Sequence, residues 1–403
     1  MSEFNVEGLV EPNWEIIRDL FEQNFRDGSE LGASLCIYHQ GKCVIDLSGG
    51  WTDQEHTKPY TRDTLQLVFS TTKGIVAAAV ALCVQRGWLD YNELVTKYWP
   101  EFGQNGKETI TVSDLLSHRA GLPTVDQCVL DDVLNWKSMT DLLAKQKPFW
   151  EPGTAHGYHA VTFGWLAGEL IRRVDPKKRS VGEFVLNEIA KPMNSEFYIG
   201  LPEDKDHRVS PLERKIQIGN MPPFTALAER ALTLNGTLSA MDPSKPNTFN
   251  SVSIHRAELP AANGITNARS LARIYASFIG DVDGHARLLN ENTLQQATRC
   301  ATPEGEPDRI LFGIPSTFGM GFMIHGVLAP IFGQGIFGHG GVGGSVAFAY
   351  PAKQLAIGYV LNELNMGFVA VDPRVQIIID AINPILDKME DTCSKSSSTQ
   401  SDL

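Results

Sequence analysis

The 403-residue sequence lacks features that would place it in several large classes of protein. Its longest apolar stretch, from Gly74 to Val84, spans 11 residues, whereas a membrane-spanning helix needs about 20. A basic stripe is also missing, because the formal net charge is −12 and the pI about 5.3. An acidic chain without such a stripe is a poor partner for nucleic acid. We therefore expect neither a membrane span nor a nucleic-acid partner.

Paired cysteines of the CxxC type are absent. The scattered cysteines indicate reduced, mostly buried thiols. Cys36 and Cys43 flank a predicted hairpin turn and could face each other, but a disulfide between them is not favoured. The N-terminus is acidic and lacks the apolar core of a signal peptide, and Asp402 stands where a peroxisomal tail needs a cation. The cytoplasm is the expected location.

The composition is that of a globular protein, with 42% hydrophobic and 20% charged residues, enough for one large domain or two interleaved ones. Apolar residues at helical spacing predict helices, and β-rich runs that meet at turns predict antiparallel strand pairs. The expected helices lie at 11–28, 73–87, 268–279 and 374–389, and the expected strand pairs turn at 40–41 and at 351–354.

Strands and helices thus lie at both ends of the chain, and a helical block lies between them. The simplest α+β architecture closes both ends into one antiparallel sheet flanked by the terminal helices, with a mainly helical second lobe. We expect the sheet lobe to comprise residues 1–69 and 256–390 and the helical lobe residues 70–255. The polar residues 391–403 are expected to form a disordered tail.

Ser70 and Lys73 open an apolar segment, in LVFSTTKG. At positions i and i+3 of a helix their side chains share one face. A serine hydroxyl becomes a nucleophile when a neighbour removes its proton. Burial can make a lysine able to do so, because it lowers the lysine pKa by up to roughly 3–5 units. The pair indicates nucleophilic catalysis; the alternative is a helix-capping serine followed by a surface lysine.

Two further stretches carry candidate site residues. Tyr158 follows the Pro-Gly loop of EPGTAHGYHA and precedes a predicted helix. A phenol there can pass a proton between nucleophile and leaving group, although a half-buried tyrosine at a helix end would look the same. His339 lies in FGHGGVGGS, a glycine-rich strand edge where a substrate can approach the backbone. The N–H groups of this edge could serve an oxyanion.

These motifs together resemble the serine β-lactamase and penicillin-binding-protein superfamily. The most similar branch is the class C β-lactamase-like group, with the family VIII esterases and the eukaryotic β-lactamase-domain proteins. The resemblance covers about residues 10–385 and implies a β-lactamase/transpeptidase-like fold. Its motifs, in order, are LVFSTTKG, ITVSDLLSHRAGLP, PGTAHGYHAVTFGWLAGEL and FGHGGVGGSVAFAYP.

The resemblance also implies a role for each candidate residue. Ser70 would be the acylated nucleophile, Lys73 its proton acceptor or electrostatic partner, and Tyr158 a general base or proton shuttle. The backbone N–H groups of Ser70 and Val342 would form the oxyanion hole. No metal or organic cofactor is implied. The residues expected to bind the substrate or its oxyanion are His339, Gly341 and Val342.

The sequence departs from the family pattern at two positions. Ala160 stands where the Tyr-x-Asn motif of β-lactamases has an asparagine, so the amide that would hold a β-lactam is missing. His339 stands at the lysine of the K-T-G motif, and a histidine is mostly neutral at pH 7. Both changes weaken an interpretation as an antibiotic- or cell-wall-directed enzyme, and they leave acyl transfer intact.

Other motifs receive structural interpretations. The run GHGGVG at 338–343 formally fits a dinucleotide fingerprint, but the alternating residues behind it predict a strand where that motif needs a helix. His156 and His159 have no further ligands to complete a metal site. His118 is expected to fix a turn, and Asn263 either does the same or points toward the cleft.

The predicted function is that of a serine hydrolase, an esterase or amidase that forms an acyl-enzyme on Ser70. Its partner would be a small or weakly charged ester, amide or peptide. One alternative is a non-enzymatic scaffold or self-assembling protein on the same fold, and the other is a true β-lactamase or D-peptidase.

Overall fold

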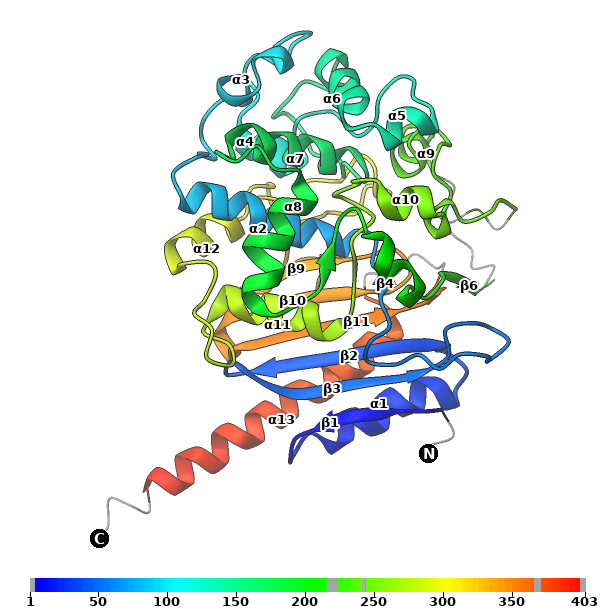
Figure 1. Cartoon of the computed structure of the whole chain (residues 1–403). Coiled ribbons are helices and arrows are strands. Elements are labelled where there is room, and N and C mark those ends of the chain that lie inside the picture. The colour runs from blue at the N-terminus through cyan, green and yellow to red at the C-terminus, as the bar shows by residue number, and fades with distance from the viewer. Residues whose placement is uncertain (1–3, 216–223, 241, 243, 366–370, 399–403) are drawn as a thin grey trace.

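A seven-stranded antiparallel sheet forms the base of the molecule (Figure 1). The computed structural model of the chain describes residues 4–215, 224–240, 242, 244–365 and 371–398. The strand order is β1-β3-β2-β11-β10-β9-β8, so the sheet closes from both ends of the chain as predicted. The strands are β1 (Glu7–Val10), β2 (Gly32–His39), β3 (Lys42–Gly50), β8 (Met323–Ile324), β9 (Phe337–Gly340), β10 (Val346–Tyr350) and β11 (Leu355–Leu361).

Both predicted strand pairs are present. β2 and β3 turn at Gln40 and Gly41, which have φ +51° and +74°, and β10 and β11 turn through residues 351–354. The sulfur atoms of Cys36 and Cys43 lie 3.8 Å apart. Both cysteines are free thiols, so they face each other across the hairpin without a disulfide.

Helices cover the two faces of this sheet. Side chains alternate between the faces of a strand, and β11 shows which helix lies on which face. The Tyr359 ring packs edge-on against Phe21 of α1, whereas Gly358 faces the backbone of α11. The helices concerned are α1 (Glu15–Arg26) and α13 (Pro373–Ser398) on the first face and α11 (Ala268–Ile279) on the second.

The C-terminal helix is longer than expected. α13 continues through Ser398, so the prediction of a disordered tail from residue 391 is wrong up to that point, and its remainder, 399–403, lies outside the described residues. The apolar half of α13 packs against α1. Once that half is formed, each further residue gains a hydrogen bond at little added cost, and the polar sequence beyond it continues as helix.

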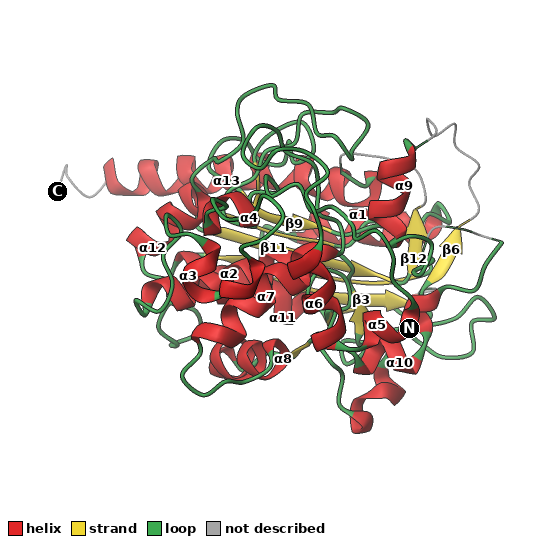
Figure 2. Cartoon of the chain, turned by 90° about the horizontal axis from the view of Figure 1, so that it is seen from above, coloured by secondary structure: helices red, strands yellow, loops and turns green. Residues whose placement is uncertain are grey.

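The remaining helices gather on one side of the sheet around α2 (Thr71–Gln85) (Figure 2). Every residue of α2 from Thr71 to Cys83 is buried, as expected for a helix that is apolar on all sides, and Gly87 follows its end with φ +70°. Three of these helices contact α2: α7 (Thr162–Val174), α8 (Val181–Val185) and α12 (Glu291–Thr298). The others are α3 (Val95–Tyr98), α4 (Val112–Leu116), α5 (Leu130–Leu134), α6 (Trp136–Lys145), α9 (Ala226–Thr233) and α10 (Val252–Arg256).

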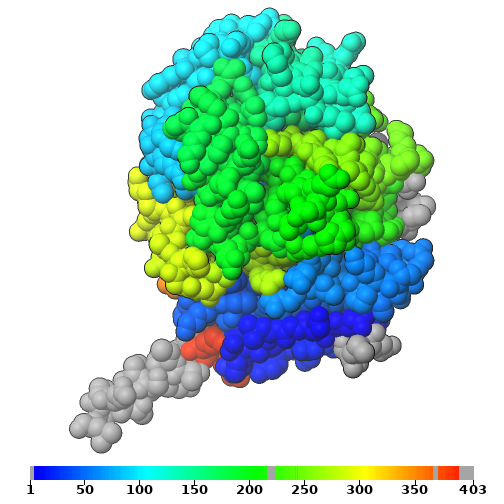
Figure 3. All heavy atoms as spheres, in the orientation of Figure 1, coloured from blue at the N-terminus to red at the C-terminus, as the bar shows by residue number. Residues whose placement is uncertain are grey.

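Two small sheets connect the helical part to the large sheet. β4, which leads into α2, pairs with β7, and β7 pairs with β5; β6 pairs in parallel with β12. In the space-filling view the cyan and green middle of the chain lies above the blue N-terminal strands (Figure 3), and the exact lobe boundaries stay a prediction. The strands are β4 (Gln66–Leu67), β5 (Phe197–Tyr198), β6 (Glu213–Lys215), β7 (Ile265–Thr266) and β12 (Glu363–Asn365).

The membrane prediction can be compared with the helices directly. No helix within the described residues is long and apolar enough to cross a membrane.

A substitution at the contact between β11 and α11 tests this packing. We expect Gly358→Ala to destabilise the protein by about 1–3 kcal/mol, because its Cβ would lie 2.6 Å from the carbonyl oxygen of Ala268. The matched control is Gly280→Ala, since a Cβ there meets no atom within 4 Å and should change stability by less than about 0.5 kcal/mol. Urea unfolding measures the free energy of unfolding of both variants. Equal values for Gly358→Ala and Gly280→Ala would contradict the close packing of β11 against α11.

Candidate active site

Ser70 lies at the start of α2, on a strained turn. Phe69, the preceding residue, has φ +45°, which is unfavourable for a bulky residue. The Phe69 ring is buried against Phe249, with ring centroids 4.9 Å apart. Thr72 also holds the turn, because its hydroxyl donates to the Phe69 carbonyl and accepts from the N–H of Gly264. These contacts hold the turn that carries Ser70 at the start of the helix.

Lys73 is fully buried beside Ser70. Its amine lies 2.9 Å from Ser70 Oγ, 2.6 Å from the Ala160 carbonyl oxygen and 2.8 Å from the Ala261 carbonyl oxygen. Asn263 secures the second of these loops, since its amide donates to two carbonyls and accepts the N–H of Leu259. Asn263 therefore has the turn-forming role rather than a place in the cleft.

Burial lowers the pKa of Lys73 well below its usual value, and no charged partner among the described residues opposes it. A neutral amine has two N–H donors and one lone pair. The two carbonyl oxygens can only accept, so they take the two N–H groups. In its neutral form the amine therefore has its lone pair left for the hydroxyl of Ser70, 2.9 Å away.

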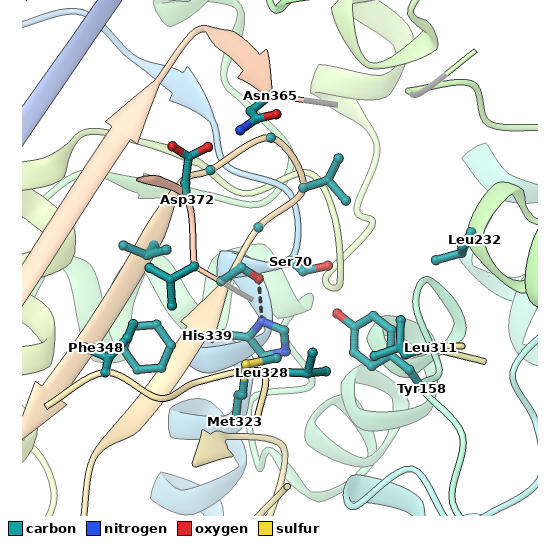
Figure 4. Close-up of a pocket in the computed structure, with 18 of the residues that line it drawn as sticks. Ser70, Tyr158, Leu232, Leu311, Met323, Leu328, His339, Phe348, Asn365 and Asp372 are labelled. Atoms are coloured by element: carbon teal, nitrogen blue, oxygen red, sulfur yellow. Dashed lines mark hydrogen bonds between the residues drawn. The ribbon is translucent and has the colours of Figure 1, made fainter. Parts of the chain in front are cut away.

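Tyr158 completes the predicted triad. Its phenol points toward Ser70 in Figure 4, with the Ser70 hydroxyl as a hydrogen-bond partner, and the Lys73 amine lies 4.9 Å from the centre of its ring. Burial, which outweighs the effect of that hydrogen bond, raises the pKa of the phenol. The structure thus brings together the hydroxyl of Ser70, an amine whose pKa is lowered by burial and a phenol whose pKa is raised by burial.

Tyr158 is held by a network that the sequence did not reveal. Asp308 is fully buried and accepts the N–H of Tyr158, at 3.1 Å, together with two N–H groups of its own loop and the hydroxyl of Ser316. The ring of His156 contacts Ser316 on one side and Glu306 on the other. Asp308 lies 150 residues from Tyr158, and a single aspartate in EPDRILFG resembles an ordinary turn residue.

His339 lies next to the triad with a neutral ring. Its Nδ1 is 2.7 Å from the Gly340 carbonyl oxygen, and a carbonyl can only accept, so Nδ1 carries the proton. Burial lowers the pKa of His339 to about 3. Nε2 is thus a buried acceptor with no partner in the part of the chain that the structure describes, and the ring supplies no positive charge at neutral pH.

The glycine-rich turn after β9 lies against the start of α2. A Cβ at Gly341 would lie 2.4 Å from the Val68 carbonyl oxygen, so only glycine fits. Gly341 donates its N–H to Ser345, and that group is therefore not available to an oxyanion. Across the described ranges, the N–H groups of Ser70 and Val342 donate no hydrogen bond. These two N–H groups are free to serve a ligand.

Ser70, Tyr158 and His339 open onto an apolar pocket of about 180 Å³ (Figure 4). Ten apolar side chains surround it, whereas its charged lining side chain, Asp372, is paired with Arg374. No cation lines the pocket among the described residues. The apolar lining residues are Phe224, Leu232, Leu311, Met323, Leu328, Ile331, Val342, Val346, Phe348 and Val371.

The other sequence motifs have the expected structural roles. Gly340 ends strand β9 and the chain continues as strand β10, so no helix follows the glycines. His159 contacts the N–H of Leu122 and the carbonyl of Gly157, and His118 accepts the N–H of His159 from a left-handed turn. No group of metal-binding side chains is present within the described residues.

Several known proteins are similar to this chain in fold and in sequence. Residues 17–380 match the model of the Beta-lactamase family. Esterase/beta-lactamase LipL of Mycobacterium tuberculosis is 32% identical over 379 residues, which are 91% of this chain and 85% of that protein. A family VIII carboxylesterase structure is 34% identical with a TM-score of 0.85 and covers 94% of this chain and 100% of its own. EstA from Arthrobacter nitroguajacolicus Rue61a is 32% identical with a TM-score of 0.83, at 94% and 98% coverage.

The chain therefore belongs to the Beta-lactamase family. This confirms the predicted superfamily, the β-lactamase/transpeptidase-like fold and the class of enzyme, a serine hydrolase. The roles of the individual site residues are part of the proposal below.

The buried amine of Lys73 should make the stability of the protein depend on pH. Burial depresses the pKa of Lys73, so between the folded-state pKa and about 10.4 the unfolded chain binds a proton that the folded protein has released. We expect the free energy of unfolding of the wild type to rise with pH in this window, by up to about 1.4 kcal/mol per pH unit more than that of Lys73→Met. Urea unfolding from pH 7 to 10 measures the difference.

The matched control is Lys137→Met, which removes a surface amine that is 81% exposed. Its pH dependence should parallel the wild type. If the wild type and Lys73→Met run parallel as well, Lys73 is protonated in the folded protein at neutral pH.

Proposed function

We propose that this protein is an esterase that hydrolyses small, uncharged esters through an acyl-enzyme on Ser70. The observation that carries the proposal is the 2.9 Å contact between Ser70 Oγ and the buried amine of Lys73, at the mouth of an apolar pocket. A serine needs a base to become a nucleophile, and this contact supplies one.

Lys73, rather than Tyr158, is the base for acylation in this proposal. Burial lowers the pKa of the amine and raises that of the phenol, so in this proposal both groups react from their neutral forms and the amine accepts the proton. Ser70 attacks the ester carbonyl as its proton passes to Lys73. The N–H groups of Ser70 and Val342 hold the oxyanion, and one such donor contributes about 10²–10³ in rate.

Tyr158 serves the leaving group. Its phenol gives a proton to the departing alkoxide, and the resulting phenolate is stabilised by the Lys73 ammonium 4.9 Å from its ring centre. Water then attacks the acyl-enzyme and its proton goes to the phenolate. When the second tetrahedral intermediate collapses, the Ser70 oxygen leaves and takes the proton back from Lys73, which restores the site.

The pocket favours uncharged substrates of limited size. His339 is neutral, and the pocket is lined mostly by apolar side chains, so a substrate carboxylate would lose its hydration without gaining a partner. The volume of about 180 Å³ is slightly larger than the roughly 150 Å³ cavity that holds benzene in an engineered protein. An acyl group of about six carbons fits such a space.

A second candidate function is β-lactam hydrolysis. The Mycobacterium tuberculosis relative is named both an esterase and a β-lactamase. The two similar structures are named only as esterases, a family VIII carboxylesterase and EstA. Ala160 offers no side-chain amide to a β-lactam in this chain; its carbonyl is engaged by Lys73. Esters are therefore the preferred substrates, and nitrocefin should be turned over at least tenfold more slowly than p-nitrophenyl hexanoate.

The test of the proposal combines a covalent probe with turnover. We expect a fluorophosphonate to label the wild type on Ser70 and p-nitrophenyl acetate and hexanoate to be hydrolysed much faster than the dodecanoate. Ser70→Ala should abolish both labelling and turnover with an unchanged circular dichroism spectrum, whereas Ser113→Ala, on helix α4, should keep both. Turnover that survives in Ser70→Ala would contradict the proposal. An absence of labelling in the folded wild type would favour the scaffold alternative.

The charge preference can be tested at His339. His339→Lys places a cation in the pocket, so kcat/KM for an ester with a carboxylate-bearing acyl group should rise at least fivefold relative to its neutral analogue. His285→Lys adds the same charge at an exposed turn and should leave this ratio unchanged. A ratio that does not differ between the two variants would mean that residue 339 does not face the substrate.

A further inference from the structure

A buried ion cluster lies directly behind the glycine-rich turn of the site. Arg374, in the first turn of α13, has a side chain that is only 5% exposed, and the carboxylates of Asp372 and Glu30 that pair with it are 1% and 0% exposed. Figure 4 places Asp372 beside Asn365 at the pocket edge. The triad does not use this cluster, and charges in such a position need a structural reason because their burial is costly.

The guanidinium of Arg374 has no N–H left for a substrate. Nε and Nη2 form a two-pronged contact with Asp372, with both distances 2.8 Å. Nη2 also donates to the Gly343 carbonyl, at 2.8 Å. Nη1 donates to Glu30 and to the carbonyls of Glu363 and Ser29. Since a guanidinium carries five N–H donors, all of them are engaged, and Arg374 acts on the protein itself.

The contact with Gly343 reaches the turn that carries the proposed oxyanion donor. Gly343 and Gly344 have φ +88° and +122°, and a Cβ on Gly344 would lie 2.6 Å from Asp372 Oδ2 and 2.9 Å from Arg374 Nη2. The backbone of this turn is therefore in close contact with the Arg374–Asp372 ion pair, with no room for a side chain between them. The Gly343 carbonyl accepts a second hydrogen bond, from the N–H of Asn365, at 3.0 Å.

Val342 lies between two anchored neighbours. On one side Gly341 donates its N–H to Ser345 at 2.7 Å, and on the other Arg374 and Asn365 hold the Gly343 carbonyl. A backbone segment fixed on both sides has little freedom to rotate its peptide planes. The N–H of Val342 donates no hydrogen bond within the described residues. Its direction is therefore fixed by the anchored peptide groups on either side.

We propose that Arg374 is a positioning residue for catalysis: it clamps the Gly343 carbonyl and so aims the Val342 N–H at the oxyanion. This rests on the proposed function, because it presumes that Val342 serves that oxyanion. Asp372 and Glu30 hold the guanidinium in the required orientation. A lysine cannot replace it, since one ammonium cannot span Asp372, Glu30 and Gly343 with fixed geometry.

The test compares an ester with its thionoester in Arg374→Lys. The sulfur of a thionoester is larger than oxygen and accepts hydrogen bonds weakly, so it gains little from the oxyanion hole. We expect Arg374→Lys to lower kcat for the ester by about 10- to 100-fold, since loss of a whole donor costs about 10²–10³, with KM changed less than threefold. The thionoester rate should fall much less, so the ester-to-thionoester ratio should drop at least tenfold.

The matched control is Arg208→Lys. Arg208 forms a two-pronged pair with Glu196, with both distances 2.7 Å, and neither residue lines the pocket. Its ester-to-thionoester ratio should equal that of the wild type. An unchanged ratio in folded Arg374→Lys, whether both rates fall together or neither falls, would overturn the clamp and leave at most a role in stability.

A second variant covers the case in which Arg374→Lys does not fold. Burial raises the pKa of Glu30 to about 7, so the assay is run at pH 8.5, where this carboxyl is ionised. Glu30→Gln keeps the shape of the partner and removes its charge, and we expect the ratio to drop at least threefold; an unchanged ratio in this folded variant overturns the proposal. Failure of the proposed function itself would look different, because Ser70→Ala would then retain ester turnover whatever the ratio in the Arg374 and Glu30 variants.

Discussion

The site depends on one amine kept out of water and held by two main-chain carbonyls. Lys73 is fully buried, and the Ala160 and Ala261 carbonyls engage its N–H groups, so in its neutral form the amine has a lone pair left for Ser70. These two carbonyls come from loops about 100 residues apart, one before α7 and one before β7. In the proposed mechanism, nucleophile activation is therefore a property of the packed core, because contact with water would favour the protonated form of the amine.

The sheet and the helical part of the chain each supply half of the site. The helical part provides Ser70, Lys73 and Tyr158 on and before helices, and the sheet provides the turn after β9. They meet where Gly341 approaches Val68 so closely that no side chain fits between them. Catalytic geometry of this kind needs supporting contacts, and Asp308 behind Tyr158 and Asn263 behind the Ala261 loop provide them.

Local sequence was sufficient for several of the elements and for the residues of the proposed site. Hydrophobic spacing located α11, both hairpins and the helix after Ser70, and the motifs around Ser70, Tyr158 and His339 marked residues that the structure brings together. Asp308 and the Arg374 cluster could not be found in this way. Each acts on a residue between about 30 and 150 positions away, and a single charged residue in a loop has the same local pattern whether it is buried or exposed. The end of α13 was also missed, because helix growth from a packed half does not depend on apolar residues.

Strand pairing between the two ends of the chain has a consequence for synthesis in the cell. His39 at the end of β2 pairs with Leu355 at the start of β11, and 316 residues separate them. At roughly 5–20 residues per second, the ribosome needs about 15–60 s to supply that partner. Until then the β2–β3 hairpin exposes an apolar edge on the nascent chain, where chaperones and unwanted strand partners compete for it.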